Sequence, residues 1–322
     1  MRVLVLGGAG FIGSCLVESL TKDKHDVVVF DKKDDEKTLK ETEYFHGDIT
    51  NKESMAQAFK EVDVVYHLVS LLEKWDTPEE DYWNVNFEGS KNVFDLSVEN
   101  GVKQLIYASS ASVIGPVTSE PLDENDPYDS SSTYKKTKIE VEKFLLSKAS
   151  SIPITIIRPE LVYGPGDLHH LKLFKMIKGK KFVMPTPGKN IIQPTYVDDI
   201  VQGFRLILMN KKAFGKKFIF AGNEIISSRQ FVDMIAENLG APVPKISIPA
   251  FISELASMSL EFLGKSFNFV PPITQSSLEF FTLNNAYDIS FAKKELGYEP
   301  AVPLKEGINM AINWYKENGL LS

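Results

Sequence analysis

The feature that most restricts the fold is a glycine-rich stretch near the start of the chain. The apolar run Val3–Leu6 leads directly into Gly7-Gly8-Ala9-Gly10-Phe11-Ile12-Gly13, and an amphipathic segment, Phe11–Lys22, follows. Glycines at this spacing allow a tight turn and bring the backbone close to a pyrophosphate, whose charge is favoured at a helix N-terminus. The order of strand, glycine turn and helix therefore predicts the first unit of a dinucleotide-binding fold.

An acidic residue after the next apolar run supports this interpretation. Asp31 directly follows Val27–Phe30. A carboxylate at this place accepts hydrogen bonds from the adenosine ribose hydroxyls and repels a 2′-phosphate, so Asp31 favours NAD over NADP. The adjacent Lys32 and Lys33 would weaken that preference. The structural alternative is that Asp31 simply begins a charged loop.

Short apolar runs alternate with helical patterns through the first half of the chain. Further runs that suit strands covered on both faces are Val62–Leu68, Gln104–Ala108 and Ile154–Ile157. Amphipathic segments lie between them, at 52–60, 79–99 and 134–148. This alternation indicates βαβ units with right-handed crossovers, and hence an α/β fold with a doubly wound parallel sheet.

The pattern loosens after about residue 165, where proline and glycine become frequent. Helical patterns recur at 169–178, 197–210, 227–239 and 304–318. We predict that residues 1–165, together with about 190–222, form the dinucleotide-binding domain. Residues of about 166–189 and 223–322 would form a smaller, mostly helical substrate-binding domain.

A tyrosine, a lysine and a serine form the candidate catalytic set. Tyr134 and Lys138 are four residues apart in a helical pattern, so their side chains leave the same face. Ser110 follows the run 104–108, at the carboxyl edge where doubly wound sheets bind ligands. A phenol, with an ordinary pKa of about 10, is a better base beside an ammonium group. A serine hydroxyl can hydrogen-bond the reacting oxygen. An exposed Tyr/Lys pair on a surface helix is the structural alternative.

Together these features resemble the extended short-chain dehydrogenase/reductases, the NAD-dependent epimerase/dehydratase superfamily with a Rossmann fold. The resemblance covers nearly the whole chain. Ile114 stands where the family often has tyrosine. The matching motifs are Gly47-Asp48-Ile49, Val65-Tyr66-His67-Leu68-Val69-Ser70, Asn86-Phe87-Glu88-Gly89-Ser90, the strand and turn 107–115, Arg158-Pro159 through Tyr163-Gly164-Pro165, Tyr196-Val197-Asp198-Asp199 and Leu296-Gly297-Tyr298-Glu299-Pro300.

The resemblance implies roles for these residues. Ser110, Tyr134 and Lys138 would form a catalytic triad, in which Tyr134 exchanges the substrate proton and Lys138 also holds the nicotinamide ribose. The implied cofactor is NAD. The residues expected to bind it are Gly7, Gly10, Phe11, Ile12, Gly13, Asp31, Lys32, Asp48, Ile49, Leu68, Val69, Ser70, Asn86, Ala108, Tyr134, Lys138, Pro159 and Val162.

The family also implies a homodimer that pairs two helices from each subunit. The candidates are 79–99 and 134–148. Their large apolar side chains are available for such an interface, although the protein core is the ordinary place for them: Trp83, Phe87, Phe94, Phe144 and Leu145.

Composition argues against several other classes of protein. The chain has 36 basic and 43 acidic residues and a net charge of −7, which is unsuited to nucleic-acid binding. No run approaches the ~18 apolar residues of a membrane span, and no signal peptide is recognised. A single cysteine, Cys15, rules out an internal disulfide framework, so we expect a cytoplasmic protein. The five histidines lack metal-ligand spacing, and no metal site is predicted.

The substrate class depends on two positions and one segment. Nucleotide-sugar members resemble one another in an Asn and an Arg that bind the diphosphate, and this chain has Leu161 and Ile192 at or near those places. Apolar side chains cannot neutralise a diphosphate. Residues 246–283 contain only four charged side chains and six phenylalanines. This segment and the sequence Gly164-Pro165-Gly166-Asp167 resemble the 3β-hydroxysteroid dehydrogenase and flavonol reductase branches.

We therefore expect an NAD-dependent oxidoreductase that acts on a secondary alcohol or ketone of an apolar, sterol-like or flavonol-like small molecule. The alternatives are a nucleotide-sugar epimerase or dehydratase of the UDP-glucose 4-epimerase type, and a catalytically idle NAD-binding scaffold. Segment 246–283 would be a lid, part of the core or a peripheral contact with a membrane. The helical spacing of Phe251, Leu255, Met258 and Phe262 suits each of these.

Overall fold

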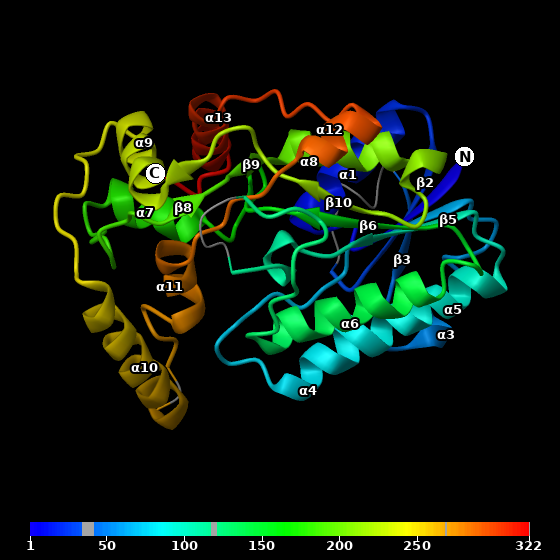
Figure 1. Cartoon of the computed structure of the whole chain (residues 1–322), viewed down its shortest axis with the longest axis horizontal. Coiled ribbons are helices and arrows are strands. Elements are labelled where there is room, and N and C mark those ends of the chain that lie inside the picture. Colours follow the sequence, from blue (N-terminus) through cyan, green and yellow to red (C-terminus); the bar gives the residue numbers. More distant parts are fainter. Residues whose placement is uncertain (34–41, 117–120, 268, 322) are drawn as a thin grey trace.

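A seven-stranded parallel sheet forms the centre of the protein (Figure 1). The computed structural model describes residues 1–33, 42–116, 121–267 and 269–321. The strand order is β10-β6-β5-β4-β1-β2-β3, and every neighbouring pair is parallel. The strands are β1 (Arg2–Leu6), β2 (Asp26–Asp31), β3 (Glu43–His46), β4 (Val64–His67), β5 (Gln104–Ala108), β6 (Ile154–Pro159) and β10 (Lys217–Phe220). The predicted doubly wound α/β fold is confirmed.

The sheet is covered on both faces, as its apolar strands require. Helices α1 (Phe11–Lys22), α8 (Val197–Ile207) and α12 (Ser290–Leu296) lie on one side, and α3 (Lys52–Met55), α5 (Gly89–Glu99) and α6 (Thr133–Ser147) on the other (Figure 1). Each face has its own hydrophobic cluster. Strands β2 and β3 follow on one side of β1, and β4, β5, β6 and β10 follow on the other. The strand order thus reverses between β1 and β4, and their carboxyl ends border the crevice where such sheets bind ligands.

The structure differs from the sequence prediction in several elements. Strands β3 and β10 were not predicted, and the helix expected at 52–60 ends at Met55. The helix expected at 79–99 is α4 (Glu79–Tyr82) followed by a π-helical stretch, Trp83–Glu88, and then α5. π-Helical stretches are rare and often occur at functional sites. This one contains the predicted cofactor-binding residue Asn86.

A second body packs at the carboxyl edge of the sheet. Helices α7 (Leu171–Lys178), α9 (Ser228–Asn238) and α13 (Leu304–Glu317) enclose a third hydrophobic cluster with two short strand pairs. The pairs are β7 (Val162–Tyr163) with β9 (Thr195–Tyr196), and β8 (Ile191–Ile192) with β11 (Ile226–Ser227). Residues 287–298, which the sequence division would assign to this body, instead contribute Tyr287, Leu296 and Tyr298 to a cluster of the main sheet.

Helix α11 (Gln275–Thr282) packs Phe280 and Phe281 against the third cluster, whereas helix α10 (Ala250–Phe267) extends away from the second body (Figure 1). Only Leu278 of α11 and the small residues Ser253, Ser257 and Gly264 of α10 are buried among their described residues. Segment 246–283 is therefore largely outside the core. None of the helices in the described ranges is long and apolar enough to cross a membrane.

Candidate active site

The glycine turn has the close packing that its sequence predicts. Gly7 has a φ of 86°, which L-residues with a side chain rarely adopt. A Cβ atom on Gly13 would lie 2.1 Å from the Gly7 carbonyl oxygen, so α1 can begin here only with glycine at this position. A Cβ on Gly7 would lie 3.1 Å from the Val69 nitrogen, which places the turn beside the predicted cofactor-binding residues Leu68 and Val69. Because glycines stand at these closely packed positions, the backbone can approach a pyrophosphate, and the turn fits a dinucleotide.

Asp31 lies at the end of β2, beside the glycine turn. Its Oδ2 accepts a hydrogen bond from the Ala9 amide at 3.0 Å, and its Oδ1 accepts one from the Lys33 amide at 3.0 Å. Asp31 therefore ties the turn to β2, and its carboxylate retains lone pairs for ribose hydroxyls. The Gly47 amide donates to the Asp31 carbonyl, which brings the predicted residues Asp48 and Ile49 to the same place.

Lys32 forms an ion pair rather than an open cationic site. Its Nζ lies 2.8 Å from Asp48 Oδ2. Partial burial opposes the charge on Asp48, but hydrogen bonds from Lys32 and Thr50 prevail and lower the pKa of this carboxyl. Because Lys32 is engaged in this way, its ability to attract a 2′-phosphate is reduced.

Asn86 connects three parts of the site through its side-chain amide. Its Oδ1 accepts hydrogen bonds from the Leu71 amide at 2.8 Å and from the Ser70 hydroxyl at 3.2 Å. Its Nδ2 donates to the Leu71 carbonyl and to Thr137 Oγ1, both at 3.2 Å. The predicted cofactor contacts Ser70 and Asn86 thus lie together, and Asn86 fixes the loop after β4 against α6.

Tyr134 and Lys138 occupy successive turns of α6. Ser132 caps this helix by accepting a hydrogen bond from the Lys135 amide. Lys138 is 2% exposed, and its Nζ donates to the Ala108 carbonyl at 2.8 Å and lies 4.8 Å from the centre of the Tyr107 ring. Within the described residues this is the single hydrogen bond of the ammonium, which leaves two N–H donors for the hydroxyls of a nicotinamide ribose.

Burial dominates the titration of this pair. It lowers the pKa of Lys138 to about 7, against the attraction of Glu142. It raises the pKa of Tyr134 to about 12, against a hydrogen bond from Ser110 that stabilises the phenolate. An ammonium on Lys138 and a phenolate on Tyr134 would stabilise each other by charge attraction. This environment therefore suits a proton transfer between Tyr134 and a bound substrate.

Ser110 and Ser109 follow β5 at its carboxyl end. The Ser110 hydroxyl lies 2.9 Å from the Ser112 hydroxyl and interacts with Tyr134. In the described part of the chain, the buried Ser109 hydroxyl has no hydrogen-bond partner. Unpaired buried polar groups are costly, and one at this sheet edge is consistent with a bound ligand. The three members of the predicted triad therefore come together.

The turn after β6 closes the other side of the crevice. Pro159 ends β6, Val162 begins β7, and the ring of Phe11 lies next to the turn at Gly166. Leu161 has a φ of 29°, and its carbonyl accepts a hydrogen bond from the Thr195 amide. By contrast, Ile192 is fully buried in the third cluster, so it does not contribute a side chain to the ligand cavity.

Tyr134 opens into a cavity of about 560 Å³. Most of its lining was not predicted residue by residue, because it comes from the loop after β4, from His169 and from four residues of segment 246–283: Leu72, Glu73, Lys74, Trp75, Asp76, His169, Val270, Thr274, Ser276 and Ser277. A second cavity of about 400 Å³ shares His169, Ser276 and Ser277 with the first. Its remaining walls are mostly apolar and include Phe182, Pro272, Phe280 and Phe281. Of these walls, Pro272, Phe280 and Phe281 belong to the charge-poor segment 246–283, whereas no local pattern identifies Phe182.

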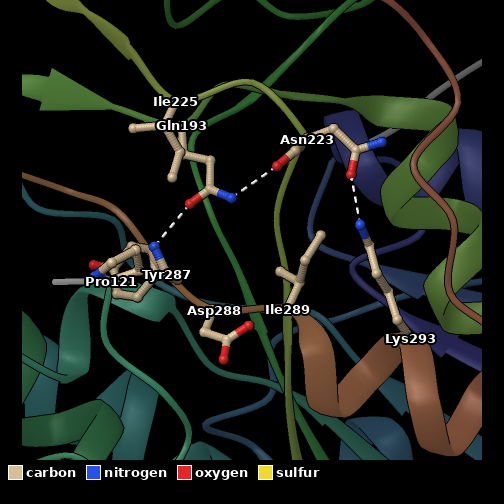
Figure 2. Close-up of a pocket in the computed structure, with 9 residues that line it drawn as sticks. Pro121, Gln193, Asn223, Ile225, Tyr287, Asp288, Ile289 and Lys293 are labelled. Atoms are coloured by element: carbon tan, nitrogen blue, oxygen red, sulfur yellow. Dashed lines mark hydrogen bonds between the residues drawn. The ribbon is translucent and has the colours of Figure 1, made fainter.

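Two other polar features lie outside this site. Figure 2 shows a pocket in which the Gln193 side chain donates to the Gly222 carbonyl and accepts from the Tyr287 amide, both at 2.7 Å. In the same pocket Lys293 Nζ donates to Asn223 Oδ1 at 2.9 Å, so these groups are already paired. Among the described residues, no three His, Cys, Asp or Glu side chains are grouped to hold a metal ion.

Comparison with known proteins agrees with this geometry. Residues 3–221 match the model of the NAD dependent epimerase/dehydratase family. The chain belongs to this family. It is an NAD-dependent enzyme of the extended short-chain dehydrogenase/reductase type, and the glycine turn and its surroundings fit the cofactor.

Individual relatives fall into two groups. The chain is 30% identical to 3beta-hydroxysteroid-dehydrogenase/decarboxylase isoform 1 of Arabidopsis thaliana, over 96% of this chain and 78% of that protein. It is 26% identical to the N-acetyl-alpha-D-glucosaminyl-diphospho-ditrans,octacis-undecaprenol 4-epimerase of Escherichia coli O157:H7, over 97% of this chain and 95% of that protein. The fold is similar to the UDP-glucose 4-epimerase of Thermus thermophilus solved with NAD, with a TM-score of 0.80, 24% identity, and coverage of 98% and 99%.

Proposed function

We propose that this enzyme transfers hydride between NAD and a secondary alcohol or ketone of an apolar, sterol-like substrate. The observation that carries the proposal is the second cavity, whose apolar walls adjoin the cavity that Tyr134 lines. A hydrocarbon skeleton buried there would gain about 25 cal/mol for each Å² removed from water. Its hydroxyl end would point past His169 toward Tyr134. The similarity to a named 3beta-hydroxysteroid dehydrogenase supports the same assignment.

Each residue of the proposed triad would have a distinct role in the reaction. The Tyr134 phenol would accept the hydroxyl proton during oxidation and return it during reduction. Ser110 would hydrogen-bond the reacting oxygen. Lys138, held by the Ala108 carbonyl, would stabilise the phenolate and bind the ribose. NAD would be held by the glycine turn, Asp31 and the residues after β4, and when bound it supplies the hydride chemistry.

A sugar-nucleotide epimerase or dehydratase is the second candidate, favoured by the similarity to an epimerase whose named substrate is a diphospho-undecaprenol sugar. Leu161 offers no hydrogen bond to a diphosphate from the place where the resemblance would put Asn. The presence of Ile192 near the place of the diphosphate-binding Arg is weaker evidence against a diphosphate than its sequence position suggests, because its side chain lies in the core. Leu161 and the apolar cavity together decide our preference, because apolar walls by themselves would also accept the hydrocarbon part of a polyprenyl diphosphate.

Ligand binding distinguishes the two candidates. We expect a 3β-hydroxysteroid such as epiandrosterone to bind the NAD-saturated enzyme in the micromolar range, and UDP to show no binding in the same calorimetric titration. Val183 lines the apolar cavity and is 39% exposed. Val183→Glu should weaken steroid binding about tenfold, because the ligand would desolvate a carboxylate.

Val98→Glu is the matched control, since Val98 lies on α5, is 41% exposed and does not line either cavity. This variant should bind the steroid as the unchanged enzyme does. Saturable micromolar binding of UDP, without a response to the steroid, would reverse our preference in favour of the epimerase.

Cofactor preference tests the proposed role of Asp31. We expect NAD to bind more tightly than NADP, because the Asp31 carboxylate would accept ribose hydroxyls and repel a 2′-phosphate. Asp31→Ala should narrow the difference between the affinities for NAD and NADP. Lys32→Ala should leave this difference largely unchanged, since Lys32 is paired with Asp48. Fluorescence titration of both cofactors measures these affinities, and equal or tighter NADP binding by the unchanged enzyme would contradict the assignment.

We further propose that the enzyme works in the cytoplasm as a homodimer. Phe94 and Leu145 are buried within the subunit and belong to the core. Trp83, Phe87 and Phe144 are only partly buried and form an edge-to-face series, with ring centres 5.7 and 6.2 Å apart. This series on the outer helices supports the dimer interface that the family implies.

A further inference from the structure

Helix α10 presents its large apolar side chains to solvent. Phe251, Leu255, Met258 and Phe262 recur along one face and are 69, 66, 56 and 71% exposed. Phe267 is 74% exposed. The residues that α10 buries are small: Ser253, Ser257 and Gly264. A helix on the surface of a globular protein ordinarily has the opposite arrangement, with its apolar face against the core.

The attachment of α10 explains why this face stays exposed. Ser253 Oγ donates to the Pro185 carbonyl at 2.5 Å, and Gly264 packs against the chain that follows, where a Cβ would lie 2.9 Å from the Phe269 carbonyl oxygen. Small residues thus seat the helix closely on the protein. Phe269 and Val270, just after the helix, are also exposed, at 39 and 77%. An apolar surface of this kind marks an interaction site.

A basic segment lies beside this apolar surface. Residues 168–184 contain five lysines and no acidic residue, in a chain whose net charge is −7. Lys172 and Lys181 from this segment line the apolar cavity together with Pro272 and Ile273, from the connection between α10 and α11. Lys172 Nζ donates to the Pro272 carbonyl at 3.0 Å. Lys172 and Lys181, the apolar cavity and the connection that follows α10 are therefore contiguous.

We propose that α10 and the lysines of 168–184 dock the enzyme on an anionic membrane surface, from which the apolar cavity receives its substrate. The exposed phenylalanines would insert at the boundary between headgroups and acyl chains, and the lysines would pair with lipid phosphates. Charge separates this occupant from a second copy of the chain, because two copies of α10 would bring two sets of these lysines together. The substrate part of the inference rests on the proposed function, whereas the docking part does not.

Vesicle sedimentation tests the docking directly. The 322-residue chain, without substrate, is mixed with vesicles of phosphatidylcholine and with vesicles that also contain phosphatidylglycerol. We expect tighter binding to the second kind. Phe262→Glu should weaken that binding about tenfold, because a phenylalanine side chain no longer leaves water. Lys175→Gln with Lys180→Gln should reduce the preference for phosphatidylglycerol, and Val98→Glu on α5 should bind as the unchanged enzyme does.

Three results would overturn the inference. The unchanged enzyme would stay in the supernatant with both kinds of vesicle, or Phe262→Glu would bind them as well as the unchanged enzyme. Alternatively, ultracentrifugation without lipid would show a dimer that Phe262→Glu dissociates, which would assign the apolar face to a second copy. Turnover of a water-soluble secondary alcohol is measured in parallel. If the unchanged enzyme does not turn over this alcohol, the proposed function is contradicted. The docking is tested separately, by vesicle binding alone.

Discussion

Tyr134→Phe should lower kcat by at least about 100-fold, the lower range for loss of a positioned acid or base. The phenylalanine ring keeps the shape of the side chain but cannot exchange a proton with the substrate. Affinity for NAD should change little, because Lys138 and the glycine turn remain. Steady-state oxidation of a 3β-hydroxysteroid, followed by absorbance of the reduced cofactor, measures the effect.

Tyr298→Phe is the matched control for this variant. The Tyr298 hydroxyl donates to the Ala221 carbonyl at 3.1 Å in the cluster beneath the sheet, away from the Tyr134 cavity. It should cost about 1 kcal/mol of stability and leave kcat unchanged. In the unchanged enzyme, oxidation should speed up as the pH rises toward 7, because burial raises the pKa of Tyr134 and only the phenolate accepts the proton. Above pH 7 the gain should level off, because burial lowers the pKa of Lys138 to about 7 and its ammonium is what stabilises the phenolate. Near-normal turnover by Tyr134→Phe would refute the assignment of the base.

Glu142→Gln should reduce the free energy of unfolding by about 3–5 kcal/mol, the cost of removing one partner of a buried ion pair. Both Arg158 and Glu142 have fully buried side chains, joined by hydrogen bonds of 2.9 and 2.6 Å. Arg158 also donates to the Glu124 carbonyl at 3.0 Å, and Tyr128 donates to Glu142 at 2.9 Å. Burial opposes the charge on Arg158, but its hydrogen bonds and attraction to Glu142 prevail and raise its pKa.

Urea unfolding at neutral pH measures this cost, and the same helix supplies a control. Glu140 pairs with Lys143 at 2.8 Å, with both side chains about half exposed. Glu140→Gln should therefore cost less than about 1 kcal/mol. Glu142→Met combined with Arg158→Met should recover much of the loss, because no uncompensated charge remains buried. A cost below about 1 kcal/mol for Glu142→Gln would show that this pair does not hold β6 to α6.

The predictions from sequence were most successful where a local pattern carries the information. The first two strands, the glycine turn and helix Phe11–Lys22 follow from apolar runs and glycine spacing, and the structure has them at those residues within one position. Tyr134 and Lys138 share a face because helical geometry requires it. Strand β10 was missed because its apolar run, between Lys217 and Gly222, is short and carries no strand signal of its own, so that pairing with β6 rather than a local pattern forms the strand.

The α/β fold and the NAD cofactor were predictable from sequence, and so was the proposed triad, because each depends on residues close together in the chain or on motifs of fixed spacing. The remaining features depend on packing between distant elements. Tertiary structure places Ile192 in the core, although its sequence position suggests a ligand contact. It pairs Arg158 with Glu142 and brings the α11 region to the cavity of Tyr134, more than a hundred residues away in sequence. It also turns the apolar face of α10 outward. The physical reason is that helical periodicity shows which residues share a face, whereas only the packing of distant elements determines what that face contacts.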